Sequence, residues 1–231
     1  MNNFLQVYDK SIRLKPNGFS LLQRVSENHW LQKNVTLPLS VDTSDELKFF
    51  HDGCGDTITV IPNIHVPVLI PKTLFDETAK EDYINLNYEI EEPVFVFEEE
   101  LDEYRLLHFI NESQKIVLEQ SGYLLQWFHL SGLLHKELRQ SERYHHRKSC
   151  FSLYVEENFI DFIFEKEGKL QIMNRFEYTS SFDILYYILN IAKQFQLAQT
   201  EISIISYNLQ DEETIGLLKQ YIGEVQVIVG Q

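Results

Sequence analysis

The sequence predicts an α/β fold built from two halves that share one order of strands and helices. Three observations support this. The stretch from about Ser149 to Val229 alternates short apolar strands with amphipathic helices. The first half opens with the same order, and an acidic segment at about residues 65–110 interrupts it. We therefore predict one domain at 1–145, which holds an insertion at about 65–110, and a second domain at 146–231.

The C-terminal domain begins with three predicted strands. Apolar residues alternate over 151–155, and residues 159–164 are apolar on nearly both faces, as in a central strand. Charged residues and an asparagine at 156–158 form the first turn. Gly168 closes the second turn, where we expect a positive φ, and a third strand follows at 170–175. The three strands predict an antiparallel meander.

Two helices and two strands complete this domain. Ser180 and Asp183 have the spacing of a capping box, so a helix is predicted to begin there. A buried strand at 202–205 follows, then a second helix that ends at Gly223 as its C-cap, and a last strand to Val229. Helical crossovers make the later strands parallel. The order is that of a ribonuclease-H-like unit.

The first half has the same order, with weaker signals. Pro16, Asn17 and Gly18 lie between two alternating runs and predict a hairpin. A strand at 35–39, a short helix capped by Ser44 and a strand at 57–61 follow. The insertion then reads as a strand at 66–70, a helix from Pro71 to Phe75, and strands at 93–97 and 104–109. Beyond it we expect a helix at 111–120, a strand at 123–130, a helix at 131–140 and a linker at 141–148.

Composition excludes several classes of partner. The 231 residues contain 20 Lys and Arg against 35 Asp and Glu, a formal net charge of −15. Nucleic acids and anionic membranes bind basic surfaces, so we expect neither as a partner. No apolar run is long enough to span a bilayer. Cys54 and Cys150 lie far apart and suggest reduced thiols, and we expect a cytoplasmic protein.

Three sequence fragments point to a family. These are residues 14–20, residues 70–75 and the run from Leu170 to Leu189. Together they resemble an uncharacterised bacterial family, domain of unknown function 3822. The resemblance implies an actin-like ATPase fold, the architecture that actin, sugar kinases and heat-shock ATPases share. It implies no activity, because the family has none assigned.

The actin-like resemblance also implies where a nucleotide would bind. In that architecture each half holds phosphates on an Asp- and Gly-rich hairpin, and the two hairpins face a groove. Gly18 and Ser20 lie on the first hairpin, but the acid is missing and Pro16 has no amide donor. Glu156 and Glu157 lie on the second hairpin, which has no glycine. These four residues are our candidates for a vestigial nucleotide cleft; the other reading is that they are turn residues.

Two functions remain open from the sequence. The first is a non-hydrolysing actin-like protein that acts through protein contacts, with no cofactor and with its partner bound through the acidic insertion. The alternative is a divergent nucleotide-binding ATPase or kinase of the actin, sugar kinase or heat-shock ATPase type. It would use Mg-ATP, with Glu156, Glu157 or Asp161 near the Mg²⁺. A ribonuclease-H-type nuclease would need carboxylates such as Asp161 and Asp183 to converge on two metals.

Other reactive residues are weaker candidates. Residues 51–56 and the pair His145 and His146 could ligate a metal, but zinc usually needs four ligands and no second pair stands out. We therefore predict no metal site. His108, His129 and His135 fall on or beside apolar elements and read as core or boundary histidines, and Cys150 reads as a small apolar residue. No phosphate-loop or nucleophile-elbow motif occurs.

Overall fold

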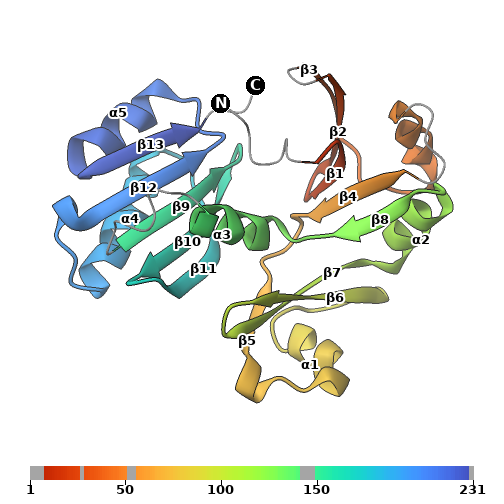
Figure 1. Ribbon diagram of the computed structural model, residues 1–231, viewed down its shortest axis with the longest axis horizontal. Coiled ribbons are helices and arrows are strands. Elements are labelled where there is room, and N and C mark those ends of the chain that lie inside the picture. Colours follow the sequence, from red (N-terminus) through yellow and green to blue (C-terminus); the bar gives the residue numbers. More distant parts are fainter. Residues whose placement is uncertain (1–7, 27–28, 51–55, 141–148, 229–231) are drawn as a thin grey trace. The chain divides into compact units, whose positions relative to one another are not determined.

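The computed structural model describes residues 8–26, 29–50, 56–140 and 149–228 (Figure 1). It divides into two compact units between Gly132 and Leu133, within helix α3 (Leu130–Gln140). The sequence-based boundary at 145/146 and the linker at 141–148 fall outside the described residues, so that boundary stays a prediction.

A mixed five-stranded sheet forms the centre of the N-terminal unit. Its order is β3-β2-β1-β4-β8, with β1, β2 and β3 antiparallel and β1, β4 and β8 parallel. The strands are β1 (Lys10–Lys15), β2 (Gly18–Ser26), β3 (His29–Val35), β4 (Thr57–Pro62) and β8 (Leu124–Trp127). The 3-10 helix η2 (Val41–Phe49) and α2 (Glu112–Gln120) contact each other and contribute Leu47, Val117 and Leu118 to the core beside this sheet.

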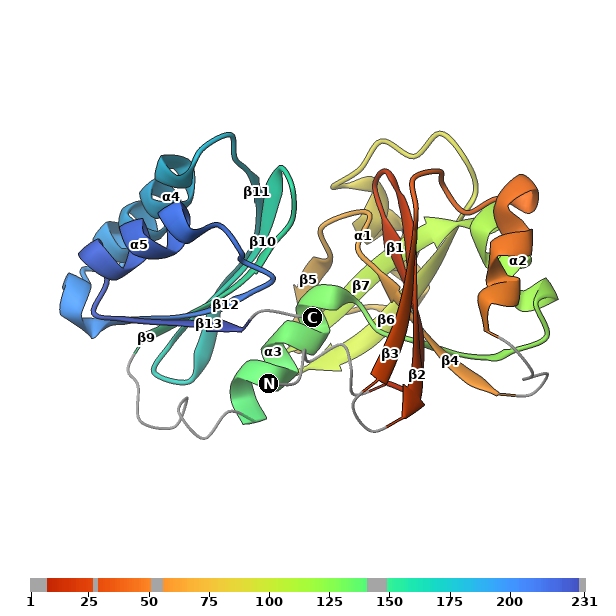
Figure 2. The same cartoon turned by 90° about the horizontal axis from the view of Figure 1, so that it is seen from above.

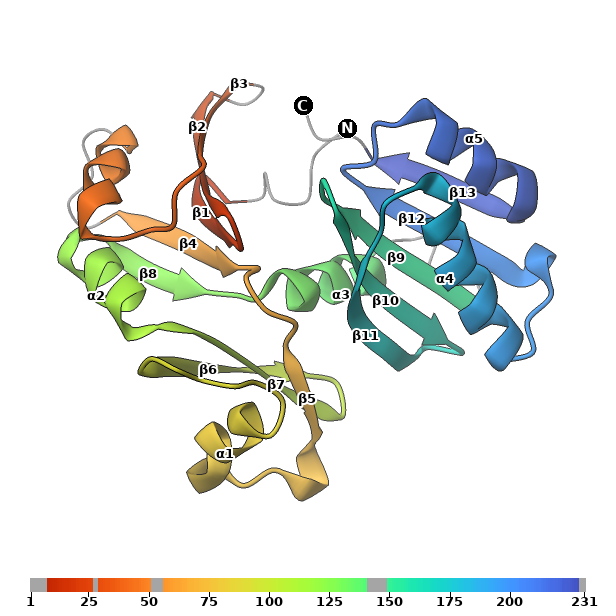
Figure 3. The ribbon, with the colours of Figure 1, turned by 180° about the vertical axis from the view of Figure 1, so that it is seen from behind.

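The insertion forms a small layer of its own. Its sheet has the order β5-β7-β6 and is antiparallel throughout. Its elements are β5 (Val68–Pro71), the 3-10 turns η3 (Lys72–Leu74) and η4 (Glu77–Ala79), α1 (Lys80–Asn85), β6 (Val94–Leu101) and β7 (Tyr104–Asn111). Helix α1 packs near β7, and Ile84, Leu107 and Phe109 share its core (Figure 3). The predicted order of strand, helix, strand, strand is confirmed, but its helix is α1 and not the segment from Pro71 to Phe75.

The C-terminal unit repeats the topology of the first sheet. Its order is β11-β10-β9-β12-β13, with an antiparallel meander of β9, β10 and β11, and with β12 parallel to both β9 and β13. The elements are β9 (Ser149–Val155), β10 (Phe159–Lys166), β11 (Lys169–Glu177), α4 (Ser181–Gln194), η6 (Gln199–Glu201), β12 (Ile202–Tyr207), α5 (Glu212–Tyr221) and β13 (Glu224–Ile228). Helices α4 and α5 lie together on one face of the sheet (Figure 2). The predicted α/β class with two ribonuclease-H-like halves is confirmed.

The third strand of the first half is β3 (His29–Val35) and not the segment expected at 35–39. Three expected helix boundaries were also wrong, two of them because a polar side chain starts or ends a helix elsewhere. Ser40, not Ser44, caps η2; its N–H donates to the Thr43 hydroxyl, while the Ser44 hydroxyl donates to the Val41 carbonyl. The helix expected from Pro71 to Phe75 is a single 3-10 turn, because Asp76 is extended and accepts the Thr78 N–H to start a new turn.

Gly223 is the third correction, since it does not serve as a left-handed cap. Ile222 ends α5, and Gly223 is absent from the residues with positive φ. Its hydrogen atom faces backbone instead: a Cβ at Gly223 would lie 3.0 Å from the Cα and carbonyl oxygen of Thr200. Its N–H donates to the Gln199 carbonyl at 3.0 Å. Glycine is needed here for close approach of two loops.

A buried ion-pair cluster attaches the C-terminal part of α3 to β10. Glu165 is only 1% exposed, and its carboxylate lies 3.0 Å from His135 Nε2 and 3.1 Å from Arg139 Nε. Arg139 also donates to the Gly168 carbonyl at 2.6 Å. A buried carboxylate is tolerated only when it is paired and hydrogen-bonded, so α3 supplies the Arg139 charge and the polar His135 ring that Glu165 needs.

The β10–β11 turn yields a stability test. Glu167 and Gly168 have φ of 51° and 74°, as a two-residue hairpin turn of type I′ requires. We expect Gly168→Ala to lower the free energy of unfolding by about 1 kcal/mol, because a Cβ at positive φ is strained. Gly216→Ala is the matched control: Gly216 lies within α5, and a Cβ there meets no atom within 4 Å. That variant should gain roughly 0.5–1 kcal/mol from helix propensity.

Urea unfolding followed by circular dichroism measures both variants. The same change from glycine to alanine is expected to lower the free energy of unfolding at position 168 and to raise it at position 216. Equal midpoints for Gly168→Ala and the wild type would contradict the turn assignment.

Candidate functional site

A cavity of about 520 Å³ lies in the C-terminal unit, and we call it the C-terminal pocket. It is lined by Val155, Glu156, Glu157, Tyr178, Thr179, Ser180, Ser181, Ile184, Asn208, Leu209, Gln210, Asp211 and Thr214. The parallel strands β9 and β12 both end at it. From β9 the chain continues to β10, toward one edge of the sheet, and from β12 it continues to β13, toward the other edge. Such a topological switch point is where open α/β sheets bind ligands.

Asn208 shapes the floor of the C-terminal pocket. It follows β12 with a φ of 61°, in the left-handed region that asparagine tolerates better than most residues. Its Nδ2 donates to the Val155 carbonyl at 2.8 Å, and its N–H donates to the Ile228 carbonyl at 3.1 Å. These bonds join the ends of three neighbouring strands, so this floor is rigid.

The turn that carries Glu156 and Glu157 uses its backbone groups internally. The Glu156 N–H donates to the Phe159 carbonyl at 2.9 Å. The Tyr178 N–H donates to the Asn158 carbonyl at 3.1 Å, and the Tyr178 hydroxyl donates to the Glu156 carbonyl at 2.5 Å. The Glu156 amide is therefore already committed, whereas a phosphate-binding turn needs amides that point at the ligand.

The electrostatics of the C-terminal pocket are acidic. Burial raises the pKa of Tyr178, and the carboxylates of Glu156, Asp211 and Glu157 raise that pKa further. The hydroxyl and N–H of Thr214 hold the pKa of Asp211 below its ordinary value, so Asp211 stays ionised at neutral pH. None of the described residues that line this pocket is a lysine or an arginine.

Both helix N-termini at this pocket are capped by carboxylates. Asp183 accepts the N–H groups of Thr179 and Ser180, each at 2.9 Å, which confirms the predicted capping box of α4. Asp211 accepts the Thr214 N–H at 2.8 Å at the start of α5. Asp183 is thus a capping residue and not a metal ligand of the described site. These amides would otherwise favour an anionic ligand. Here they face the protein's own carboxylates.

Asp161 is not available to a metal in the way the ATPase and nuclease hypotheses required. It is 2% exposed on β10, and its Oδ1 lies 2.8 Å from both Nε and Nη2 of Arg175. Arg175 in turn lies over the ring of Phe159, 4.0 Å from its centroid. Asp161 is therefore half of a structural ion pair, and it is not among the residues that line the pocket.

Gly18 and Ser20, the candidates of the first hairpin, lie in β2 of the N-terminal unit. Gly18 pairs with Lys15, and a Cβ built on it would lie 2.0 Å from the Val35 carbonyl oxygen. Its small size therefore lets β3 pass close by. Ser20 pairs with Arg13 on β1 and with Asn34 on β3. These two residues and the Glu156 turn belong to different units, so the cleft between the halves stays a prediction.

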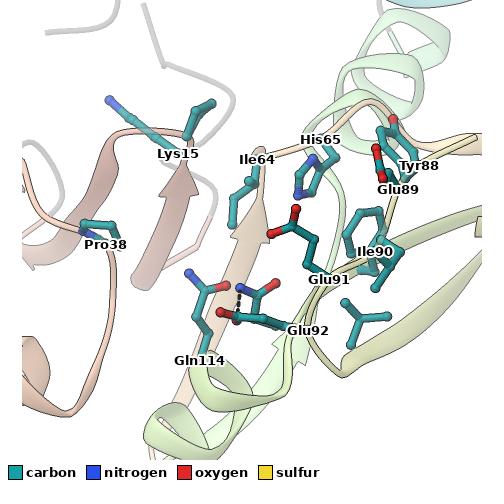
Figure 4. Close-up of a pocket in the computed structure, with 14 residues that line it drawn as sticks. Lys15, Pro38, Ile64, His65, Tyr88, Glu89, Ile90, Glu91, Glu92 and Gln114 are labelled. Atoms are coloured by element: carbon teal, nitrogen blue, oxygen red, sulfur yellow. Dashed lines mark hydrogen bonds between the residues drawn. The ribbon is translucent and has the colours of Figure 1, made fainter.

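The N-terminal unit has its own cavity of about 430 Å³, which we call the N-terminal pocket (Figure 4). It occupies the equivalent switch point: Lys15 ends β1 and Pro16 follows it, and Ile64 and His65 follow the parallel strand β4. The remaining lining residues are Pro38, Tyr88, Glu89, Ile90, Glu91, Glu92, Val94, Phe109, Asn111 and Gln114. Because the insertion lies between β4 and α2, its segment 88–94 becomes one wall of this pocket.

Sequence reasoning identified the acidic insertion but not this pocket. The segment from Tyr88 to Glu92 alternates apolar and acidic residues without forming a strand. Tyr88 and Ile90 pack on the core of the insertion, while Glu89 and Glu91 are exposed. That alternation was a usable signal for a half-buried wall. The contribution of Gln114 from α2 had no sequence signal, because it depends on how α2 packs.

The predicted core histidines are buried. His108, His129 and His135 are 3%, 1% and 2% exposed. His108 Nε2 lies 3.4 Å from Glu99, and His129 Nδ1 accepts the Ser131 N–H at 3.1 Å. Cys150 is buried, as expected of a small apolar residue.

In the described part of the chain, no three His, Cys, Asp or Glu side chains are placed to hold a metal. No described helix is long and apolar enough to cross a membrane. Cys54, the loop at 51–55 and the pair His145 and His146 lie outside the described residues.

Comparison with known structures defines the class of this protein. It resembles a Bacteroides thetaiotaomicron VPI-5482 protein with an actin-like ATPase fold and unknown function, with a TM-score of 0.73, 20% identity, and coverage of 99% of this chain and 94% of the other. It also resembles a chain of the PilM–PilN type IV pilus biogenesis complex, with a TM-score of 0.52, 11% identity and coverage of 96% and 90%. The protein has an actin-like ATPase fold.

The family is shown by a sequence profile. Residues 1–225 match the profile of DUF3822, which is described as a protein of unknown function. The chain therefore belongs to the DUF3822 family, and the predicted family is confirmed. No curated protein matches the chain.

The acidic surroundings of Tyr178 can be tested by titration. We expect Glu156→Gln with Glu157→Gln to lower the pKa of Tyr178, because two of the three carboxylates that raise it lose their charge. Burial is the largest cause, so the pKa should stay above the ordinary value of about 10. The measurement is ¹³C NMR of ring-labelled tyrosine, with Tyr178→Phe to assign the signal.

The matched control for this titration is Glu212→Gln with Glu213→Gln. It removes the same charge from the same unit, at positions that do not line the pocket. An equal pKa in both double variants would show that Glu156 and Glu157 do not act on Tyr178.

Proposed function

We propose that this protein is a non-hydrolysing member of the actin-like fold that acts through contacts with another protein. The observation that carries the proposal is the acidic C-terminal pocket at the switch point of the sheet. Glu156, Glu157 and Asp211 act together on Tyr178, and no described lining residue is a lysine or arginine. A fold gives no function by itself, so the proposal rests on this site.

The charges in the C-terminal pocket disfavour a nucleoside triphosphate. Two like unit charges 4 Å apart repel by about 4 kcal/mol at the effective dielectric constant typical of a protein surface. Three carboxylates would face a ligand that itself carries several negative charges. The residues present therefore do not fit a triphosphate.

The first hairpin offers no replacement phosphate cradle. Pro16 has no N–H, and the space beside Gly18 is filled by the Val35 carbonyl oxygen. An oxygen at that position repels an anion, whereas a phosphate cradle would present amide hydrogens. Both hairpins thus have the backbone fold of the actin-like architecture, but their residues do not form its phosphate-binding turns.

The fold comparison supports action through protein contacts. PilM, whose fold this chain resembles, is described in a complex with PilN. A chain with this fold can therefore work as part of a protein assembly. The acidic insertion of our protein holds twelve Asp and Glu and one Lys between Asp76 and Glu103, and its exposed carboxylates can take part in such a contact.

A divergent ATPase or kinase is the second candidate, favoured by one observation. Carboxylate oxygens are the ligands that Mg²⁺ prefers, and Glu156, Glu157 and Asp211 all line one cavity. A Mg²⁺ held there would neutralise part of the repulsion and let a nucleotide bind. The two candidates differ in whether Mg-ATP stabilises the folded protein.

Thermal unfolding with and without Mg-ATP decides between them. We expect no shift in Tm and no ATP hydrolysis above background in the wild type. A bound nucleotide at about a hundred times its dissociation constant would add roughly 2.7 kcal/mol, which raises Tm by several degrees. Glu156→Gln with Glu157→Gln should behave as the wild type does.

A Mg-dependent rise in Tm that this double variant abolishes would overturn the proposal and support the second candidate. Glu212→Gln with Glu213→Gln is the control, because it makes the same charge change outside the pocket. An ATP-binding protein of the same fold, assayed in parallel, shows that the conditions detect binding.

A further inference from the structure

We infer that the N-terminal pocket binds a short segment of a partner protein that presents a lysine or arginine beside an apolar side chain. This inference rests on the proposed function, since it assumes that the chain acts by binding another protein. It adds the place of binding and the chemistry of the partner.

The first wall is aromatic and rigid. The His65 ring stacks on Phe109 with centroids 4.4 Å apart and an interplanar angle of 14°. Tyr88 meets Phe109 edge-on at 5.2 Å, and its hydroxyl donates to the Val66 carbonyl at 2.5 Å. Ile64, Ile90 and Val94 extend this wall with aliphatic surface. A preformed apolar wall binds an apolar side chain without first having to be ordered.

The second feature is a row of carboxylates on the segment 88–94. Glu89, Glu91 and Glu92 are exposed and line the same pocket, and Figure 4 shows the Glu91 carboxylate close to His65. Glu92 Oε2 accepts a hydrogen bond from Asn111 Nδ2 at 3.0 Å, which holds it at the pocket. Lys15 is the only lysine or arginine among the described lining residues. The net negative charge attracts a cation and speeds its encounter.

Third, Gln114, which lines the pocket, carries an acceptor that lacks a donor within the described structure. Gln114 Oε1 is buried, and no described residue donates a hydrogen bond to it. A buried acceptor without a partner costs stability, so a ligand that brings an N–H gains that energy on binding. Guanidinium, ammonium and peptide N–H groups are all donors.

These features select a peptide over the other ligands of such a pocket. A phosphate or an acidic peptide is repelled by the three glutamates. A bare metal ion would leave the aromatic and aliphatic wall unused. A basic side chain fits both the apolar wall and the row of carboxylates. Its methylenes pack on apolar surface, while its charged end meets carboxylates or a ring face. A volume of about 430 Å³ lies within the range of ligand sites.

The test is a selection of phage-displayed random heptapeptides on the immobilised full chain. We expect the recovered peptides to be enriched in lysine or arginine next to an aliphatic or aromatic residue. The best peptide is then synthesised with a fluorescent label, and its Kd is measured by anisotropy at two salt concentrations.

The variants separate the pocket from the general acidity of the chain. Glu89→Gln, Glu91→Gln and Glu92→Gln together should weaken binding roughly tenfold and reduce its salt dependence, because three rim charges are lost. Gln keeps an acceptor oxygen for Asn111, so the variant should fold. The control is Glu81→Gln, Glu103→Gln and Glu112→Gln, which are exposed in the same unit and do not line the pocket. It should bind as the wild type does.

Three results would overturn the inference: no recovered peptide, an acidic or uncharged consensus, or equal weakening by the two triple variants. None of them affects the Mg-ATP experiment. Stabilisation by Mg-ATP, in contrast, would overturn the proposed function and leave the peptide result standing. The two failures are therefore distinguishable.

Discussion

The parallel pairing of β1 with β4, and of β9 with β12, is the constraint on which the rest of the structure depends. Parallel neighbours need a crossover, and their carboxyl ends then meet at one edge of the sheet. In the C-terminal unit this brings the turn at 156–158 next to Asn208, which donates to Val155. In the N-terminal unit the Asn63 N–H donates to the Leu14 carbonyl at 2.8 Å. Each repeat thereby acquires a pocket at the same place in its topology.

The two pockets differ because only one repeat carries the insertion. In the C-terminal unit, β12 leads directly to α5, and short polar loops surround the cavity. In the N-terminal unit, the insertion separates β4 from α2 and adds Tyr88, Ile90 and Phe109 to the walls. One switch point is thus lined by hydroxyls and carboxylates, and the other has an apolar wall with a carboxylate rim.

The acidic side chains of this protein have three different structural roles. Glu165 and Asp161 are almost fully buried, and each is matched by an arginine. Asp183 and Asp211 cap helices and are held ionised by the hydrogen bonds that they accept. The glutamates of both pockets form a third group, and their charge faces a cavity.

The sequence by itself determined the periodic features of this protein. Alternation over 151–155, the capping box of Ser180 and Asp183, and the turn at Gly168 predicted their elements, because these signals lie within a few residues of one another. The tertiary structure alone decided which distant residues meet. Asp161 read as a free carboxylate until Arg175 was seen beside it, Gly18 read as a phosphate-turn glycine until the Val35 carbonyl was seen against it, and Gln114 carried no signal at all. Contacts across strands and between a helix and a loop depend on packing, which local periodicity does not encode.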